Sequence, residues 1–181
     1  MASKACKSAG TMLVVTIFLI GCTSTSPPKT SSEARTPIGY AVHCALEPES
    51  AFCIESTQYS SDEQEIDYRS LQLHLMHKFK YVTDQEKYGT VEDWRSHTED
   101  FLQGKQFSGD CDDYALTCAE VLIEKGADPS DVAIAYGKNE LGEGHLACIY
   151  KGWVLDNRNK WPMPWDNFGY DYTGLMYMSQ P

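Results

Sequence analysis

The sequence is poor in basic residues. Only 15 Lys and Arg stand against 26 Asp and Glu among 181 residues, which gives a formal net charge of −11. Nucleic-acid binding depends on clustered Lys and Arg that contact phosphates, so this composition argues against that class of function. We therefore expect no nucleic-acid partner.

The sequence also lacks any pair of cysteines at the C-x-x-C spacing. Its seven cysteines are too few for a disulfide-dense miniprotein and too widely spaced for a zinc finger. Hydrophobic residues make up 42% and charged residues 23%, which is ordinary for a globular domain. The length suits a single domain with one core.

No apolar run is long enough to span a bilayer, which takes roughly 20 residues. The short apolar run Met12–Ile20 follows Lys4 and Lys7, a pattern typical of a secretory signal peptide. It ends at Leu19-Ile20-Gly21-Cys22, which resembles a bacterial lipobox. We expect residues 1–21 to be a lipoprotein signal peptide; the alternative is an ordinary signal with a chance cysteine.

Lipidation of Cys22 would anchor the chain in a membrane facing the periplasm. The residue after it is Thr23 rather than an Asp that would favour inner-membrane retention, so we favour the outer membrane. Residues 22–37 are rich in Ser, Thr and Pro and predict a tether. The folded domain is then expected over 38–181.

Helical patterns precede strand patterns in this domain, an order that predicts an α+β fold with helices packed on an antiparallel sheet. His74 and His77 lie three residues apart on the first helix, and without a third ligand we interpret them as surface or packing residues. We expect helices over 61–81 and 111–126, and a short helix-like stretch between them that follows Val91–Trp94 and ends near Gly104. We expect strands at Val132–Tyr136, His145–Tyr150 and Trp153–Leu155.

Four cysteines fall within the domain away from its helix starts. Cys44 and Cys53 flank a short stretch with a turn signal, so outside the cytoplasm we expect them to form a disulfide, with two free thiols as the alternative. Cys118 and Cys148 are most simply buried thiols, although a disulfide between them is an alternative.

The order Cys111, His145, Asp156 carries the chemistry. Cys111 begins a helix, whose N-terminal N–H groups and partial positive charge favour a thiolate. His145 opens a strand after Gly142-Glu143-Gly144, and Asp156 follows the next strand. Adjacent antiparallel strands would bring the carboxylate beside the imidazole, which predicts a nucleophile, a base and an orienting acid.

The segment Gly109-Asp110-Cys111-Asp112-Asp113-Tyr114-Ala115 resembles the active-site motif of the bacterial transglutaminase-like cysteine proteinases, which include LapG-type periplasmic proteases of large surface adhesins. This resemblance implies a papain-like, transglutaminase-like fold and a cysteine endopeptidase that cleaves a protein substrate. The further matching segments are Thr36–Tyr40, Cys44, Pro48, Cys53, Tyr88-Gly89, Asp93-Trp94, Leu155–Asn157 and Pro164-Trp165.

Three carboxylates surround a sulfur that must become an anion. Asp110, Asp112 and Asp113 should by themselves raise the pKa of the Cys111 thiol. In one interpretation Asp110 caps the helix while the other two face solvent. In the other, the resemblance implies a Ca²⁺ ion held by Asp110 and Asp112, a hard cation that prefers oxygen ligands; Asp113 is the poorer candidate.

Two other functions fit the same residues. The triad could perform amide hydrolysis or transfer on another substrate, such as a cell-wall peptide. The chain could also be a non-catalytic binding lipoprotein of the same fold. The resemblance further implies regulation by a membrane receptor that responds to cyclic-di-GMP. The backbone N–H of Cys111 is the first oxyanion donor that we expect, and no side chain stands out as the second.

Overall fold

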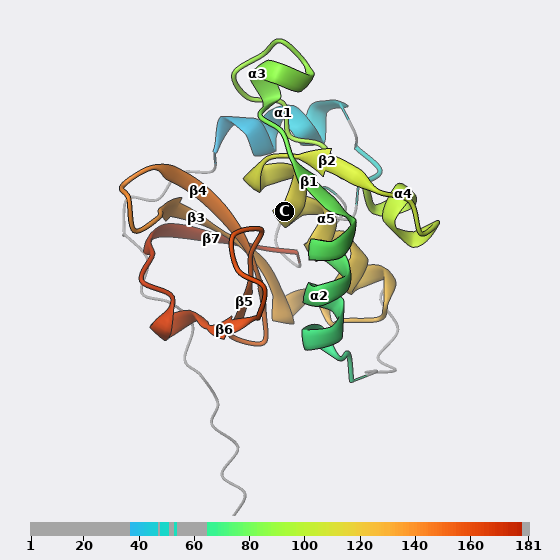
Figure 1. Ribbon diagram of the computed structural model, residues 1–181, viewed down its shortest axis with the longest axis vertical. Coiled ribbons are helices and arrows are strands. Elements are labelled where there is room, and N and C mark those ends of the chain that lie inside the picture. The colour runs from blue at the N-terminus through green and yellow to red at the C-terminus, as the bar shows by residue number, and fades with distance from the viewer. Residues whose placement is uncertain (1–36, 47, 51–52, 54–64, 179–181) are drawn as a thin grey trace, which may run out of the picture.

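The computed structural model describes residues 37–46, 48–50, 53 and 65–178 (Figure 1). The predicted signal peptide, the lipidation site at Cys22 and the tether up to residue 36 lie outside the described residues. Within the described part, no helix is both long enough and apolar enough to cross a bilayer.

The first half of the domain is helical. A predicted helix over 61–81 is shorter in the structure: α2 begins after Asp67, whose carboxylate accepts hydrogen bonds from the backbone N–H groups of Arg69 and Ser70. The short helix-like stretch predicted to end near Gly104 is confirmed as a helix over Thr98–Leu102. The helices are α1 (Ile38–Leu46), α2 (Tyr68–Lys78), α3 (Asp84–Lys87), α4 (Thr98–Leu102) and α5 (Cys111–Glu124).

Helix α5 is the central element of the fold. Every residue from Asp112 to Ile123 is buried. The helix ends at Glu124, and Gly126 follows with a φ of +89°, a left-handed conformation that glycine adopts without strain. The helix that the sequence predicts from Cys111 is therefore confirmed at both ends.

The second half of the domain is an antiparallel sheet in the order β6-β5-β4-β3-β7. The three strands predicted from the sequence are present, and β6 and β7 add to them, with β7 beside β3. Two further short strands, β1 (Phe79–Tyr81) and β2 (Phe107–Gly109), pair in parallel. The sheet strands are β3 (Val132–Lys138), β4 (Gly144–Tyr150), β5 (Trp153–Leu155), β6 (Met163–Pro164) and β7 (Asp171–Tyr177).

The main core lies between α5 and one face of the sheet. Leu116, Leu122 and Val121 of α5 are fully buried together with Ile134 of β3 and Leu155 of β5. Figure 1 shows the helices gathered on one side and strands β3 to β7 on the other. This arrangement confirms the predicted α+β class, with helices packed on an antiparallel sheet.

The cysteines and the histidine pair are placed largely as predicted. Cys44 of α1 is joined to Cys53 by a disulfide, and Cys118 and Cys148 are buried free thiols. His74 packs against the ring of Phe101, with the ring centroids 4.8 Å apart. Among the described residues, no group of metal-ligating side chains includes a histidine.

Candidate active site

Cys111 is the first residue of α5 and lies directly after the parallel strand β2. Asp110 is the N-cap, and its carboxylate accepts the backbone N–H of Asp112 at 3.3 Å. The first N–H groups of a helix have no partner inside the helix, so the Cys111 sulfur lies at the end of α5 that carries a partial positive charge. Asp110 therefore caps the helix, as one interpretation of the sequence predicted.

His145 and Asp156 meet as the strand order predicts. The Nε2 atom of His145 lies 2.6 Å from Oδ2 of Asp156, and both side chains are buried. Because an ionised carboxylate only accepts, Nε2 carries the proton in this pair, and Nδ1 is left as the nitrogen that can accept one. Asp156 thereby fixes the tautomer and orientation of the imidazole.

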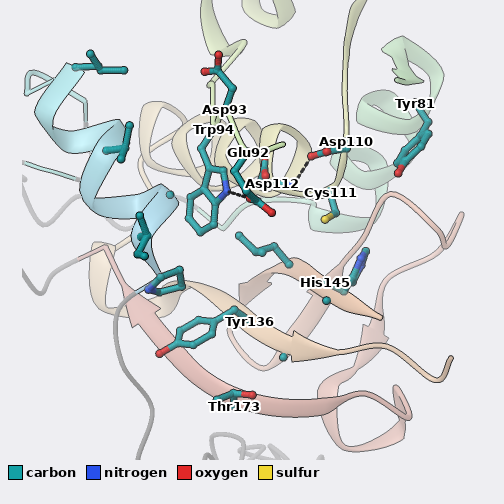
Figure 2. A pocket seen from close by; sticks show the side chains of 18 residues that line it. Tyr81, Glu92, Asp93, Trp94, Asp110, Cys111, Asp112, Tyr136, His145 and Thr173 are labelled. Atoms are coloured by element: carbon teal, nitrogen blue, oxygen red, sulfur yellow. Dashed lines mark hydrogen bonds between the residues drawn. The ribbon is translucent and has the colours of Figure 1, made fainter. Parts of the chain in front are cut away.

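Cys111 and His145 line one cleft. The backbone N–H of Leu146, the residue after His145, donates a hydrogen bond to the Cys111 sulfur. Figure 2 shows the sulfur and the imidazole pointing toward one another from α5 and β4 across a cleft of about 800 Å³. The structure thus brings together all three residues that the sequence pattern singled out.

The protein environment disfavours the thiolate. Burial, the largest cause, together with the charges of Asp110, Asp112 and Asp156, raises the pKa of the Cys111 thiol to about 12, and the Leu146 N–H opposes this rise. The helix N-terminus alone therefore does not activate this sulfur. A proton acceptor or a compensating positive charge is needed beside it.

A compact carboxylate cluster lies directly behind Cys111. One oxygen each of Asp84, Asp112 and Asp113 falls within 4.8 Å of the others, and all three residues are buried. The expectation that Asp112 and Asp113 could face solvent is therefore wrong, because α5 turns both into the domain. Asp113, which the sequence pattern made the poorer candidate, belongs to the cluster, and Asp84 was missed.

Each carboxylate of this cluster leaves one oxygen without a hydrogen bond: Oδ1 of Asp84, Oδ1 of Asp112 and Oδ2 of Asp113. Burial and the neighbouring acids raise the pKa of Asp112 to about 10 and that of Asp84 to about 6. Asp113 is partly compensated, since Lys87 Nζ and His97 Nε2 each lie 3.7 Å from its Oδ2. Three buried carboxylate oxygens without a hydrogen bond are a donor set that fits a hard divalent cation.

Further side chains hold the Asp156 loop in place. Gln72 of α2 donates to the backbone oxygen of Asp156 at 2.8 Å, and Tyr114 of α5 donates to Gln72 Oε1 at 2.9 Å. The hydroxyl of Tyr170 lies 3.4 Å from Oδ1 of Asp156. Sequence reasoning missed these residues because their roles depend on contacts between distant segments.

A comparison of the whole sequence with models of protein families agrees with the chemistry that the site geometry suggests. A family model described as "Bacterial transglutaminase-like cysteine proteinase BTLCP" matches residues 30–180. The chain belongs to the bacterial transglutaminase-like cysteine proteinases. The resemblance read from the sequence motif is thus confirmed, and this cysteine proteinase family accounts for nearly all of the domain.

Solved structures of Legionella pneumophila LapG are also similar to this cysteine proteinase. The calcium-bound form is 20% identical with a TM-score of 0.45, and the match covers 61% of this chain and 70% of that one. The EGTA-treated form is 20% identical with a TM-score of 0.45, covering 60% and 66%. A third LapG structure is 19% identical with a TM-score of 0.45, covering 62% and 69%. No curated protein matches the chain.

Proposed function

We propose that this cysteine proteinase is an endopeptidase whose catalytic residues are Cys111, His145 and Asp156. The observation that carries the proposal is that the Cys111 sulfur faces an imidazole whose far nitrogen is held by Asp156 at 2.6 Å. This is the arrangement that nucleophilic cleavage of an amide requires: a thiol, a base within reach and an orienting carboxylate.

In the proposed reaction the Cys111 sulfur attacks the carbonyl carbon of a peptide bond. His145 Nδ1 takes the thiol proton and returns it to the leaving amine, and water then hydrolyses the acyl-enzyme. The backbone N–H of Cys111 supplies one donor to the oxyanion. Asp156 stays ionised and stabilises the imidazolium that forms between these steps.

We also propose that Asp84, Asp112 and Asp113 hold a Ca²⁺ ion, with Asp110 beside them. The support is the set of three buried carboxylate oxygens without a hydrogen bond, of which only Asp113 Oδ2 is partly compensated, by Lys87 and His97. When bound, the ion would supply positive charge that lowers the raised pKa of the Cys111 thiol. The sequence suggested Asp110 and Asp112 as the calcium ligands. The present assignment retains Asp112 and replaces Asp110 by Asp84 and Asp113.

For the cellular setting, we propose a lipid anchor on Cys22 that holds the domain at a membrane facing the periplasm, with the outer membrane favoured. The support is the lipobox-like Leu19-Ile20-Gly21-Cys22 and the Ser/Thr/Pro-rich segment that follows it. The proposed substrate is a protein exposed in that compartment, such as a large surface adhesin. A membrane receptor that sequesters the protease remains a further proposed partner.

The test incubates the full-length chain with surface-protein extracts, with Ca²⁺ or with EGTA, and sequences the new N-termini. We expect defined fragments with Ca²⁺, few with EGTA and none with Cys111→Ala. Persistent cleavage by Cys111→Ala would overturn the assignment. A primary amine added to the reaction distinguishes the transferase alternative, because a transferase would incorporate the amine instead of releasing a new N-terminus.

A further inference from the structure

Helix α1 presents an apolar stripe to the catalytic cleft. Ile38, Val42 and Leu46 recur at intervals of four residues and therefore lie on one face of the helix. They are 83%, 49% and 72% exposed, although large apolar side chains are usually buried. All three line the same cleft as Cys111 and His145. The exposed face is thus continuous with the site of the proposed chemistry.

The inner face of α1 fixes how this stripe is oriented. A Cβ on Gly39 would lie 2.4 Å from the indole of Trp94, so the helix sits against that ring as closely as the backbone allows. His43 is buried, and its Nδ1 and Nε2 lie 3.3 Å from the Trp94 carbonyl oxygen and 3.1 Å from Ser50 Oγ. The contacts of Gly39 and His43 hold α1 against the domain. In this orientation the stripe of Ile38, Val42 and Leu46 lines the cleft.

The rest of the cleft wall shows which side chains it would accept. Opposite α1 the wall is formed by Tyr136 of β3 and Thr173 of β7 (Figure 2), and Leu146 of β4 also lines the cleft. No Lys or Arg lies among the described lining residues, and the carboxylates of Glu92, Asp93, Asp110 and Asp112 line the cleft. Such a wall favours an apolar side chain and repels an acidic one.

A second, smaller cavity adjoins the main cleft at Cys111 and His145 and has a different character. It encloses about 310 Å³ and shares Tyr81, Cys111, Gly144 and His145 with the main cleft, and its other lining residues are polar. Asn139, Glu143, Asn157 and Arg158 are among those residues. A peptide that crosses Cys111 would therefore meet an apolar wall on one side of the scissile bond and a polar wall on the other.

We propose that Ile38, Val42 and Leu46 form a specificity subsite that binds an apolar substrate side chain on one side of the scissile bond. The occupant is the substrate peptide itself, because the stripe and Cys111 line one continuous cleft. This inference rests on the proposed endopeptidase function and adds its substrate class: segments with an apolar residue on that side and no acidic residue there.

The experiment digests a synthetic decapeptide library with the full-length chain and maps the cleavage sites by mass spectrometry. Wild type is expected to select apolar residues at one or two positions on a single side of the cut. Val42→Asp should reduce kcat/KM for those peptides by roughly ten- to hundredfold and shift the preference at that position toward Lys and Arg. Alkylation of Cys111 by iodoacetamide should stay unchanged.

Leu102→Asp is the matched control, because Leu102 of α4 is 50% exposed against 49% for Val42 and does not line the cleft. It should leave the cleavage pattern as in wild type. If the library is cut without any apolar preference, or if both variants change the cleavage preference equally, the subsite proposal is wrong. The endopeptidase proposal is not affected by that result. If wild type cuts no peptide, the endopeptidase proposal fails and the subsite falls with it.

Discussion

The ring of Tyr170 meets the imidazole of His145 edge to face, with the ring centroids 5.1 Å apart and the planes at 79°. The Tyr170 hydroxyl also lies 3.4 Å from Oδ1 of Asp156, the carboxylate oxygen that His145 does not use. Asp156 Oδ1 receives a second donor, the backbone N–H of Arg158, at 2.7 Å. One tyrosine therefore contacts both the proposed base and the residue that orients it.

Tyr170→Phe is expected to lower kcat by about two- to tenfold, with little change in KM, because a hydrogen bond of this kind contributes about 0.5–1.5 kcal/mol. Steady-state kinetics over a pH series would measure the effect and any displacement of the pH profile. Tyr172→Phe is the matched control, since the buried Tyr172 hydroxyl has no hydrogen-bond partner among the described residues. Equal losses in the two variants would contradict a positioning role for Tyr170.

The carboxylate cluster predicts that stability without calcium falls as pH rises. The pKa of Asp84 is raised from 3.8 to about 6 by burial, so folding favours its protonated form. That stabilisation is present below the unfolded pKa and is lost as pH rises through about 6. In EGTA, Tm should decrease between pH 4 and pH 7 on this account, and calorimetry would measure it.

Added Ca²⁺ should raise Tm more at pH 7 than at pH 4.5, because a cation binds the ionised carboxylates and competes with protons. Mg²⁺ is the control ion, since it demands a tighter octahedral geometry and keeps its waters. A Tm shift that is independent of pH, or equal for the two ions, would contradict a calcium site built from these acids.

Asp84→Asn separates the cation site from the catalytic residues. The substitution removes one of the three unpaired carboxylates while leaving Cys111, His145 and Asp156 in place. We expect the Tm in EGTA to rise, because a buried charge is removed, and the calcium-dependent increase in Tm to disappear. Asp166→Asn, on an exposed residue outside the cleft, is the matched charge control and should behave as wild type.

The sequence predicted which residues meet in the proposed catalytic site better than it predicted their surroundings. Cys111, His145 and Asp156 could be found because each stands at the start or end of an element with a strong local pattern. Asp84 could not be found, because it lies 28 residues before Asp112 and joins it only after β1 and β2 pair. Sequence distance hides such contacts, and the same holds for Gln72 and Tyr170.

Periodicity also explains which elements were predicted. The alternation and apolar character of β3 and β4 are local signals, and both strands were expected. Strand β7 was not, because its residues Asp171–Tyr177 mix polar and aromatic side chains and it gains its place only by pairing with β3. One of the two interpretations of the α5 carboxylates placed Asp112 and Asp113 in solvent, yet packing buries that helix on all sides.

The disulfide between Cys44 and Cys53 is expected to support substrate selection as well as stability. It joins α1 to the segment that carries Ser50, whose hydroxyl donates to Glu120 of α5 at 2.5 Å. Replacing both cysteines by serine should lower stability by about 2–3 kcal/mol.

The same double substitution should raise KM for peptides with an apolar residue at the α1 stripe, and this effect should exceed any loss of kcat. The reason is that α1 is then less firmly held, while the contacts of Cys111, His145 and Asp156 are unchanged. Denaturant unfolding and kinetics on one apolar and one polar peptide would measure both effects, with Cys118→Ser as a control for a buried free thiol. A loss of kcat without a change in KM would show that the disulfide acts on the catalytic residues rather than on the cleft wall.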